Sequence, residues 1–279
     1  MTATTPEPAP LLAVDGLRKR YGLSGGGSLT AADDITFTVP AGGSLGIVGE
    51  SGSGKTTVAR MLVGLVRPDA GTVSVAGRTR TPRTPRGRAA RLARAREIQM
   101  VFQDPYVSLD PRLTARRCLT TALRLHGREE DLADGLLDRV GLGAREAGAL
   151  PHGLSGGQRQ RLAIARALAV DPRVLVLDEA VAALDVSIQA QILQLLGEVR
   201  RDTGVALVFV SHDLAVVQHI TDEVLVMRRG TVVEQGPTAG VLAGPQDPYT
   251  RLLLASVPRA GWDPAEAVTA RAATAPRGA

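Results

Sequence analysis

The sequence has one cysteine, few aromatic residues and no long hydrophobic run. Because Cys118 is the only cysteine, an intrachain disulfide and a thiolate-held zinc or iron–sulfur site within one chain are excluded. No stretch reaches the roughly 18 consecutive apolar residues of a transmembrane helix, so the sequence predicts no membrane span. The first ten residues, MTATTPEPAP, have neither a basic nor an apolar region, and they are not expected to form a signal peptide.

Lysine is also scarce, and the positive charge is carried almost entirely by arginine. The formal net charge is +5, and Lys19 and Lys55 are the only lysines. A basic segment between residues 78 and 96 holds arginines at positions 78, 80, 83, 86, 88, 91, 94 and 96. Such a segment can contact nucleic acid, anionic lipid or a partner protein, or it can simply be solvated. No aromatic residue lies within it to stack on bases, so we expect a solvated segment and no nucleic-acid partner.

Short apolar runs alternate with helical patterns along the chain. The sequence predicts strands at 11–14, 35–39, 44–48, 174–177 and 205–210, and a final hairpin of 224–227 and 232–234. Helical patterns begin at Thr57, cover roughly 113–152, and follow the strands at 174–177 and 205–210. This alternation predicts an α/β fold with a mainly parallel sheet. Residues 1–10 and 260–279 are rich in Pro, Ala, Thr or Arg, and we expect them to be disordered.

A glycine-rich loop follows the apolar run at 45–48. Its sequence, GESGSGKT, fits the pattern G-x-x-x-x-G-K-[ST] and opens the first helical pattern. Glycines let several backbone N–H groups point at one phosphate, and the helix N-terminus adds a positive dipole end. We therefore predict that Lys55 reaches the β- and γ-phosphates of ATP and that Thr56 binds Mg²⁺. The predicted nucleotide-binding residues of this loop are Gly49, Glu50, Ser51, Gly52, Ser53, Gly54, Lys55, Thr56 and Thr57.

Two acidic residues, Asp178 and Glu179, end the apolar strand at 174–177. Alone, this pattern also fits a solvated turn after a core strand. In open α/β sheets, however, ligands bind at the carboxyl ends of strands, and a phosphate loop lies upstream. We therefore predict that Asp178 binds Mg²⁺, through water, and that Glu179 orients or deprotonates the attacking water.

The run LSGGQRQR at 154–161 precedes another helical pattern. Ser155 is a typical N-cap residue, and the two following glycines leave backbone N–H groups open to an anion. Alone, the run would indicate only a helix start. Between a phosphate loop and a strand ending in Asp-Glu, it resembles the nucleotide-binding subunits of ATP-binding cassette (ABC) transporters. The resemblance covers roughly residues 12–258. It implies a P-loop NTPase core of the ABC type with a mainly parallel sheet, an N-terminal antiparallel β subdomain and an inserted helical subdomain.

The same resemblance assigns roles to further residues. Tyr21 matches the aromatic residue that stacks on adenine, although it also fits a tyrosine on a strand surface. Gln103 matches the Q-loop glutamine that contacts Mg²⁺ or the water, Asp185 matches the D-loop, and His212 matches the switch histidine that contacts the γ-phosphate. The expected catalytic residues are Glu179, His212 and Gln103, and the expected metal-binding residues are Thr56, Gln103 and Asp178.

In this family, two cassettes pack head to tail with ATP between them. The phosphate loop of one cassette then faces the signature of the other, whose nucleotide-binding residues here are Ser155, Gly156, Gly157 and Gln158. The resemblance implies a cassette at 11–240 with a helical subdomain at about 104–160, followed by a C-terminal extension at 241–259.

Three stretches resemble one branch, the ATPases of dipeptide and oligopeptide (peptide/nickel-type) importers. They are QDPYVSLDPR at 103–112, the run at 179–191, and GPQDPYTRLLLASVP at 244–258. Asp110 stands where this branch usually has Asn, and the cysteine cluster that some members carry is absent. This resemblance implies two transmembrane permease partners, a second identical or homologous cassette, and indirectly an extracytoplasmic solute-binding protein. The expected location is peripheral, on the cytoplasmic face of the plasma (inner) membrane. Alternatives are a soluble ABC-type ATPase acting on nucleic acid or the ribosome, and an exporter ATPase.

Overall fold

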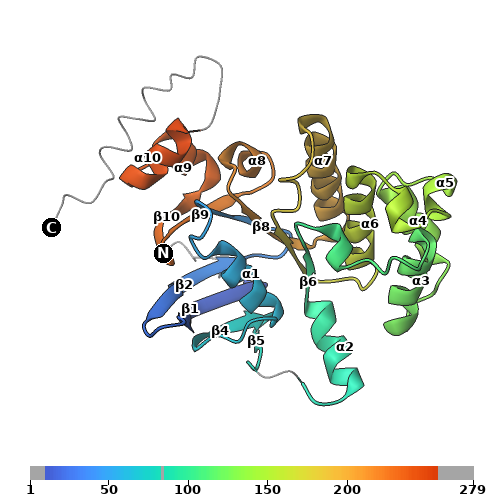
Figure 1. The fold of residues 1–279 in the computed structure, drawn as a ribbon, viewed down its shortest axis with the longest axis horizontal. Helices are drawn as coiled ribbons and strands as arrows, with labels where there is room; N and C mark the ends of the chain where they lie inside the picture. The colour runs from blue at the N-terminus through green and yellow to red at the C-terminus, as the bar shows by residue number, and fades with distance from the viewer. Residues whose placement is uncertain (1–9, 83–84, 257–279) are drawn as a thin grey trace, which may run out of the picture.

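The computed structural model describes residues 10–82 and 85–256, and it contains two β-sheets with helices packed around them (Figure 1). Apart from Pro10, the expected disorder at 1–10 and 260–279 lies outside the described residues. The smaller sheet has the strand order β2-β1-β4-β5, with every pair antiparallel. Its strands are β1 (Leu12–Gly22), β2 (Ser28–Val39), β4 (Ala70–Val75) and β5 (Arg78–Thr79). The first two strands are much longer than the sequence predicted.

The larger sheet has the order β10-β9-β3-β8-β7-β6. All its neighbouring strands are parallel except for the final hairpin of β9 and β10, so the prediction of a mainly parallel sheet is confirmed. The final hairpin was expected, and it turns at Arg229 and Gly230. The strands are β3 (Ser44–Val48), β6 (Ile98–Val101), β7 (Val174–Asp178), β8 (Ala206–Ser211), β9 (Glu223–Arg228) and β10 (Thr231–Pro237).

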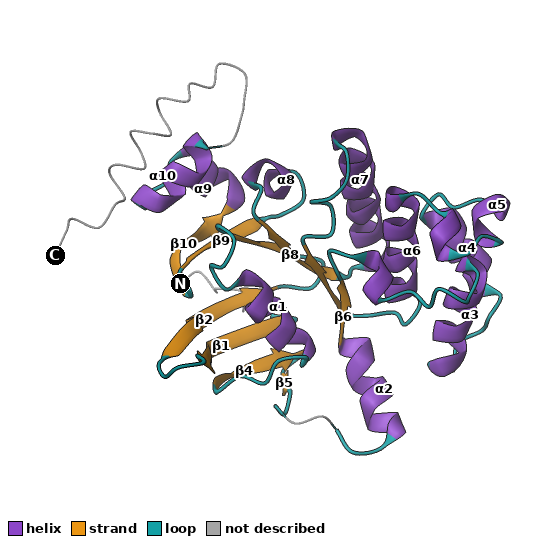
Figure 2. Cartoon of the chain, viewed as in Figure 1, coloured by secondary structure: helices purple, strands orange, loops and turns teal. Residues whose placement is uncertain are grey.

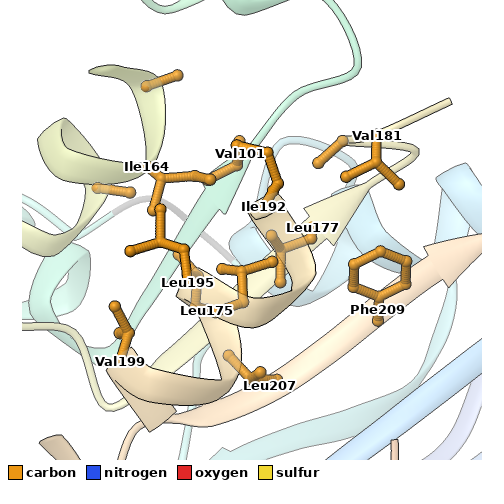
Figure 3. Close-up of a cluster of buried hydrophobic side chains, with 14 of the residues drawn as sticks. Val101, Ile164, Leu175, Leu177, Val181, Ile192, Leu195, Val199, Leu207 and Phe209 are labelled. Carbon is orange, nitrogen blue, oxygen red and sulfur yellow. The ribbon is translucent and has the colours of Figure 1, made fainter. Parts of the chain in front are cut away.

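Alternate residues of the central strands face two different hydrophobic cores. Leu175 and Leu177 of β7 point into a core shared with the helices on one face of the sheet. Val174 and Val176 point into the other core, toward the smaller sheet. Because side chains alternate along a strand and both faces are covered, these strands are continuous apolar runs. Figure 3 shows part of the first core, with the labelled side chains of Val101, Ile164, Leu175, Leu177, Val181, Ile192, Leu195, Val199, Leu207 and Phe209.

The helices divide by the surface that they cover (Figure 2). Between the two sheets lies α1 (Lys55–Val63), which follows the glycine-rich loop. The first core is covered by α6 (Gly156–Leu168) and α7 (Val186–Thr203). The apolar residues Ile188, Ile192, Leu195, Leu196 and Val199 of α7 repeat at helical spacing, and all of them are buried except Ile188, which is partly buried. A short helix, α8 (Leu214–Gln218), follows β8 and packs on the same core.

Only helices lie between residues 105 and 153. They are η1 (Pro105–Val107), α3 (Ala115–Leu125), α4 (Leu132–Arg139), α5 (Ala144–Ala147) and η2 (Pro151–Gly153). Two further helices, α9 (Thr238–Ala243) and α10 (Pro248–Ala255), follow the final hairpin. Within residues 10–82 and 85–256, no helix combines the length and the apolar character needed to cross a bilayer.

The arginine-rich segment forms a helix that the sequence did not predict, α2 (Arg88–Glu97), none of whose residues is buried. Arg80, which follows β5, does not fit the expected solvated segment because it is buried. Its guanidinium pairs with Glu97 at 2.9 Å and donates to the backbone oxygen of Leu62. Burial lowers the pKa of Arg80, and the neighbouring Arg94 acts in the same direction. This arginine therefore has a structural role, since it ties β5 to α1 and α2.

Candidate functional site

The glycine-rich loop joins the carboxyl end of β3 to the start of α1. The buried Lys55 folds back over it, and its Nζ donates to the carbonyl oxygens of Gly49 and Glu50 at 2.7 and 2.8 Å. Burial lowers the pKa of Lys55, while the nearby carboxylates of Glu179, Asp178 and Glu50 act in the opposite direction. The Lys55 ammonium is therefore shielded from water and hydrogen-bonded to backbone carbonyls of the loop. Such a group is suited to pairing with an anion.

Two glycines in this loop are required by close backbone contacts. Gly49 and Gly54 have φ angles of 151° and 107°, in the region that favours glycine. A Cβ at Gly49 would overlap the carbonyl oxygen of Met227, and a Cβ at Gly54 would overlap that of Ala31. The loop is thus packed against β9 on one side and β2 on the other.

The turn of the β9–β10 hairpin also holds the loop. The Gly230 N–H donates to the Ser53 carbonyl at 2.9 Å, and the Gly230 carbonyl accepts from the Asp33 N–H at 2.8 Å. Gly230 therefore joins the loop to β2, the strand paired with the one that carries Tyr21. Backbone contacts from two sheets fix the loop before any ligand is bound.

Thr56 and Asp178 meet at the carboxyl edge of the sheet. The Thr56 hydroxyl donates to Oδ1 of Asp178 at 3.0 Å, which brings together residues far apart in the sequence. Asp178 is 6% exposed, and burial raises its pKa, with the neighbouring Glu179 adding to the effect. The Thr56 hydrogen bond and the cations Arg60 and Lys55 oppose this shift. A hydroxyl beside a buried carboxylate is a hard oxygen pair, and such donors fit Mg²⁺.

Glu179 and His212 lie next to this pair. Oε1 of Glu179 is 3.5 Å from Nδ1 of His212, which follows β8. The Glu179 backbone has a φ of 49°, which is unusual for a residue other than glycine, and its N–H donates to the Val210 carbonyl at 3.0 Å. This left-handed conformation turns the chain at the end of β7, and such strained residues cluster at functional sites. The structure therefore brings together Lys55, Thr56, Asp178, Glu179 and His212 near the carboxyl ends of the parallel strands β3, β7 and β8.

The LSGGQ segment opens α6 as predicted, with Ser155 as the N-cap. The Ser155 hydroxyl accepts from the Gln158 N–H at 3.2 Å, and the Gln158 side chain accepts from the Ser155 N–H at 2.9 Å. A Cβ at Gly157 would press against Ile188 at the start of α7, which packs the segment close to the Asp185 turn. Asp185 itself caps α7 by accepting from the Ile188 N–H at 2.9 Å.

The structure does not join this segment to the glycine-rich loop of the same chain. In the part of the chain that the structure describes, no hydrogen bond or ion pair links residues 155–158 to residues 49–57. Two other predicted site residues, Tyr21 and Gln103, make no hydrogen bond or ion pair with Lys55, Thr56, Asp178, Glu179 or His212 in the described structure. Tyr21 is 39% exposed on β1 with Lys19 Nζ 5.4 Å from its ring centre, and Gln103 is exposed beyond β6. Their predicted contacts with nucleotide remain predictions.

One contact to the loop was missed by the sequence analysis. The hydroxyl of Tyr249, on α10, accepts from the Glu50 N–H at 2.9 Å. Tyr249 lies within the run 244–258 that the sequence analysis singled out, but a tyrosine in such a run gives no indication of which backbone amide it will reach.

We predict that Asp178→Asn stabilises the ligand-free protein. Asparagine has nearly the same shape and still accepts from Thr56, but it removes a desolvated negative charge beside Glu179. Gains of about 1 kcal/mol are typical when a functional group is relieved of such a cost, which here would raise the melting temperature by roughly 2–4 °C. Differential scanning calorimetry without nucleotide measures this, with the exposed Asp138→Asn as a matched control. A melting temperature equal to or below that of wild type would contradict the prediction.

The chain is similar to known proteins over most of its length. The family model "ABC transporter" matches residues 32–182. The probable peptide ABC transporter ATP-binding protein y4tS of Sinorhizobium fredii is 47% identical over 259 residues, covering 89% of this chain and 72% of that protein. The glutathione import ATP-binding protein GsiA of Escherichia coli K12 is 46% identical over 260 residues. This alignment covers 89% of the chain but only 41% of GsiA.

Solved structures give the same result for the fold. The ATP-binding cassette MJ0796, in a dimeric post-hydrolysis state bound to ADP and Pi, matches with a TM-score of 0.73 and 28% identity. The match covers 81% of this chain and 98% of that one. CbiO1 of Clostridium perfringens, part of the transporter complex cbiONQ, matches with a TM-score of 0.71 and 29% identity, covering 84% of this chain and 91% of that one.

Proposed function

The chain belongs to the ABC transporter family, and on that basis we propose that it is the ATP-hydrolysing subunit of an importer for peptides or similar small solutes. The observation that carries the proposal is the cluster of Lys55, Thr56, Asp178, Glu179 and His212 at one edge of the parallel sheet. The choice of an importer is supported by the 45–47% identity to ATP-binding proteins named for peptide transport and glutathione import.

We assign the phosphates of ATP to the loop at 49–57. Its backbone N–H groups and the start of α1 would bind them, and Lys55 would move from the Gly49 and Glu50 carbonyls to the β- and γ-phosphates. Exchanging carbonyl partners for phosphate oxygens pairs the desolvated ammonium with a full negative charge, which makes the exchange favourable. We retain the exposed Tyr21 as the residue that stacks on adenine.

Thr56 and Asp178 would hold Mg²⁺, and Gln103 would join them or the water once nucleotide is bound. The chemistry that Mg²⁺ supplies there is neutralisation of charge on the β- and γ-phosphate oxygens. In the hydrolysis step, the water oxygen bonds to the γ-phosphorus, the bond to the ADP oxygen breaks, and Glu179 takes the proton of the water. His212, 3.5 Å from Glu179, would orient that carboxylate and contact the γ-phosphate.

The second half of the site would come from another cassette. Ser155, Gly156, Gly157 and Gln158 are separate from the loop of their own chain, yet Ser155 and the open end of α6 are suited to bind an anion. We infer a head-to-tail pair in which ATP lies between one phosphate loop and the LSGGQ segment of the partner, with Asp185 beside it. ATP would then favour the closed pair, and hydrolysis would let it open.

We place the subunit on the cytoplasmic face of the plasma membrane, peripheral to two permeases and indirectly served by an extracytoplasmic solute-binding protein. The name of the relative GsiA supports the assignment to import, and that of y4tS supports a peptide transporter. No observation on the described residues favours nucleic acid as a partner, since the exposed α2 arginines carry no aromatic residue among them.

The test is a pull-down from detergent-solubilised membranes of the source cell with tagged Glu179→Gln and Mg-ATP. We expect two multispan permeases, with or without a second cassette, because a turnover-deficient subunit stays in the ATP-bound state. Glu223→Gln is a matched control, since Glu223 is exposed at the start of β9 and away from the site. Reproducible capture of only ribosomes, nucleic acid or soluble proteins would contradict the importer.

A further inference from the structure

The N-terminal end of α10 reaches the phosphate loop across nearly the whole length of the cassette sequence. The Tyr249 hydroxyl lies 2.9 Å from the backbone nitrogen of Glu50 and accepts its hydrogen bond. The side chain is 1% exposed, one of the largest fully buried side chains of the chain's described part. Fixing a buried tyrosine so that its hydroxyl reaches a loop amide costs side-chain entropy. The contacts that hold the tyrosine therefore show how this hydrogen bond is maintained.

Several contacts fix the segment before Tyr249. The carboxylate of Glu234, on β10, accepts from the backbone N–H groups of Gln246 and Asp247 at 2.8 and 3.1 Å. Asp247 then caps α10 by accepting from the Tyr249 N–H at 2.7 Å. The guanidinium of Arg228, on β9, lies 4.8 Å from the centre of the tyrosine ring. These contacts set the position of the phenol independently of the loop (Figure 1 shows α10 beside α9 above the β9–β10 hairpin).

The hydrogen bond acts on one peptide unit of the loop. The carbonyl of Gly49 and the N–H of Glu50 belong to the same planar peptide group. Its oxygen accepts from Lys55 Nζ at 2.7 Å, and its N–H donates to Tyr249 at 2.9 Å. This unit is therefore held from both sides, by the proposed phosphate-binding lysine and by the C-terminal extension.

Gly49 lowers the intrinsic cost of rotating this peptide unit, so the contacts on the unit matter for its orientation. Its φ of 151° is open to glycine alone, and a glycine lowers the cost of flipping the peptide that follows. A flip would point the Gly49 carbonyl away from Lys55 and would remove one of the two carbonyl partners of the ammonium. The Tyr249 hydroxyl opposes the flip because it would lose its donor.

We propose that Tyr249 is a positioning residue for ATP binding, whose hydroxyl fixes the Gly49–Glu50 peptide and through it the resting place of Lys55. The C-terminal extension thereby becomes part of the nucleotide site, although Tyr249 need not touch the nucleotide. The inference rests on the proposed function, since it assumes that the loop binds ATP.

The test is Tyr249→Phe, which keeps the buried ring and removes only the hydroxyl. We expect the Kd for ATP to rise about fivefold, which corresponds to about 1 kcal/mol, a typical contribution of one hydrogen bond. Hydrogen exchange at the Glu50 amide, measured by NMR, should become faster in the variant. Tyr106→Phe is the matched control, because Tyr106 is 43% exposed and its side chain contacts Arg159 through the ring, with no hydrogen bond of its hydroxyl in the described structure.

A second variant separates positioning from general stability. Leu252→Ala removes a buried side chain of α10 without touching the phenol, and it should lower the melting temperature more than Tyr249→Phe does while leaving ATP affinity closer to wild type. If Tyr249→Phe binds ATP like wild type, or if affinity falls in both variants only in proportion to melting temperature, the proposal is wrong. If wild type itself binds no ATP, the proposed function fails instead.

Discussion

Replacing Glu179 by glutamine should reduce ATP hydrolysis by two to four orders of magnitude and leave ATP binding nearly unchanged. Glutamine keeps the size of the side chain and its place at the left-handed turn after β7. Its amide cannot accept a proton from water, and loss of a general base costs roughly 10²–10⁴ in rate. Because Glu179 makes no hydrogen bond to the glycine-rich loop, the phosphate-binding groups are expected to remain as they are.

Two measurements check this result. Phosphate release should fall to background in Glu179→Gln, while the Kd for ATP stays within about twofold of wild type. The control Glu223→Gln makes the same chemical change at an exposed position and should hydrolyse ATP normally. Hydrolysis at the wild-type rate in Glu179→Gln would remove Glu179 as the base and direct attention to His212 or Gln103.

Much of the proposed site was predictable because its signals are local. A glycine-rich loop between an apolar strand and a helix is recognisable from consecutive residues, and these residues include Lys55 and Thr56. Asp178 and Glu179 were predictable for a similar reason, since an apolar run that ends in acids places them at the carboxyl edge of a parallel sheet. Ser155 was predicted as an N-cap from its residue type and the helical pattern after it, and the structure confirms this and shows a capping box with Gln158.

Other features depend on contacts that residue patterns do not encode. The left-handed conformation of Glu179 depends on the hydrogen bond from its N–H to the Val210 carbonyl, which links the neighbouring strands β7 and β8. The link from Tyr249 to Glu50 spans residues that only the complete fold brings together.

Some of the secondary structure was missed because its apolar signal is weak, although the apolar strand β6 was also not predicted. Strands β1 and β2 extend far beyond their apolar runs because mutual hydrogen bonding, rather than burial, orders residues near Tyr21. The helix α2 was missed because it has no buried face to create an apolar period.

Replacing Lys55 by alanine should weaken ATP binding by roughly 10- to 100-fold, because a hydrogen bond to a charged group contributes about 1.5–3 kcal/mol. The free energy of unfolding of the ligand-free protein should fall by less than this. Burial already lowers the pKa of Lys55, so the ammonium is costly to keep there, and its present partners are neutral loop carbonyls. The large effect is thus expected only with nucleotide. Titration with a fluorescent ATP analogue measures the change in ATP affinity, and melting curves with and without ATP measure the change in stability. The exposed Arg91→Ala is a charge-matched control. An unchanged Kd in Lys55→Ala would mean that the loop is not the phosphate site, whereas an equal loss of stability with and without ATP would make Lys55 a structural residue.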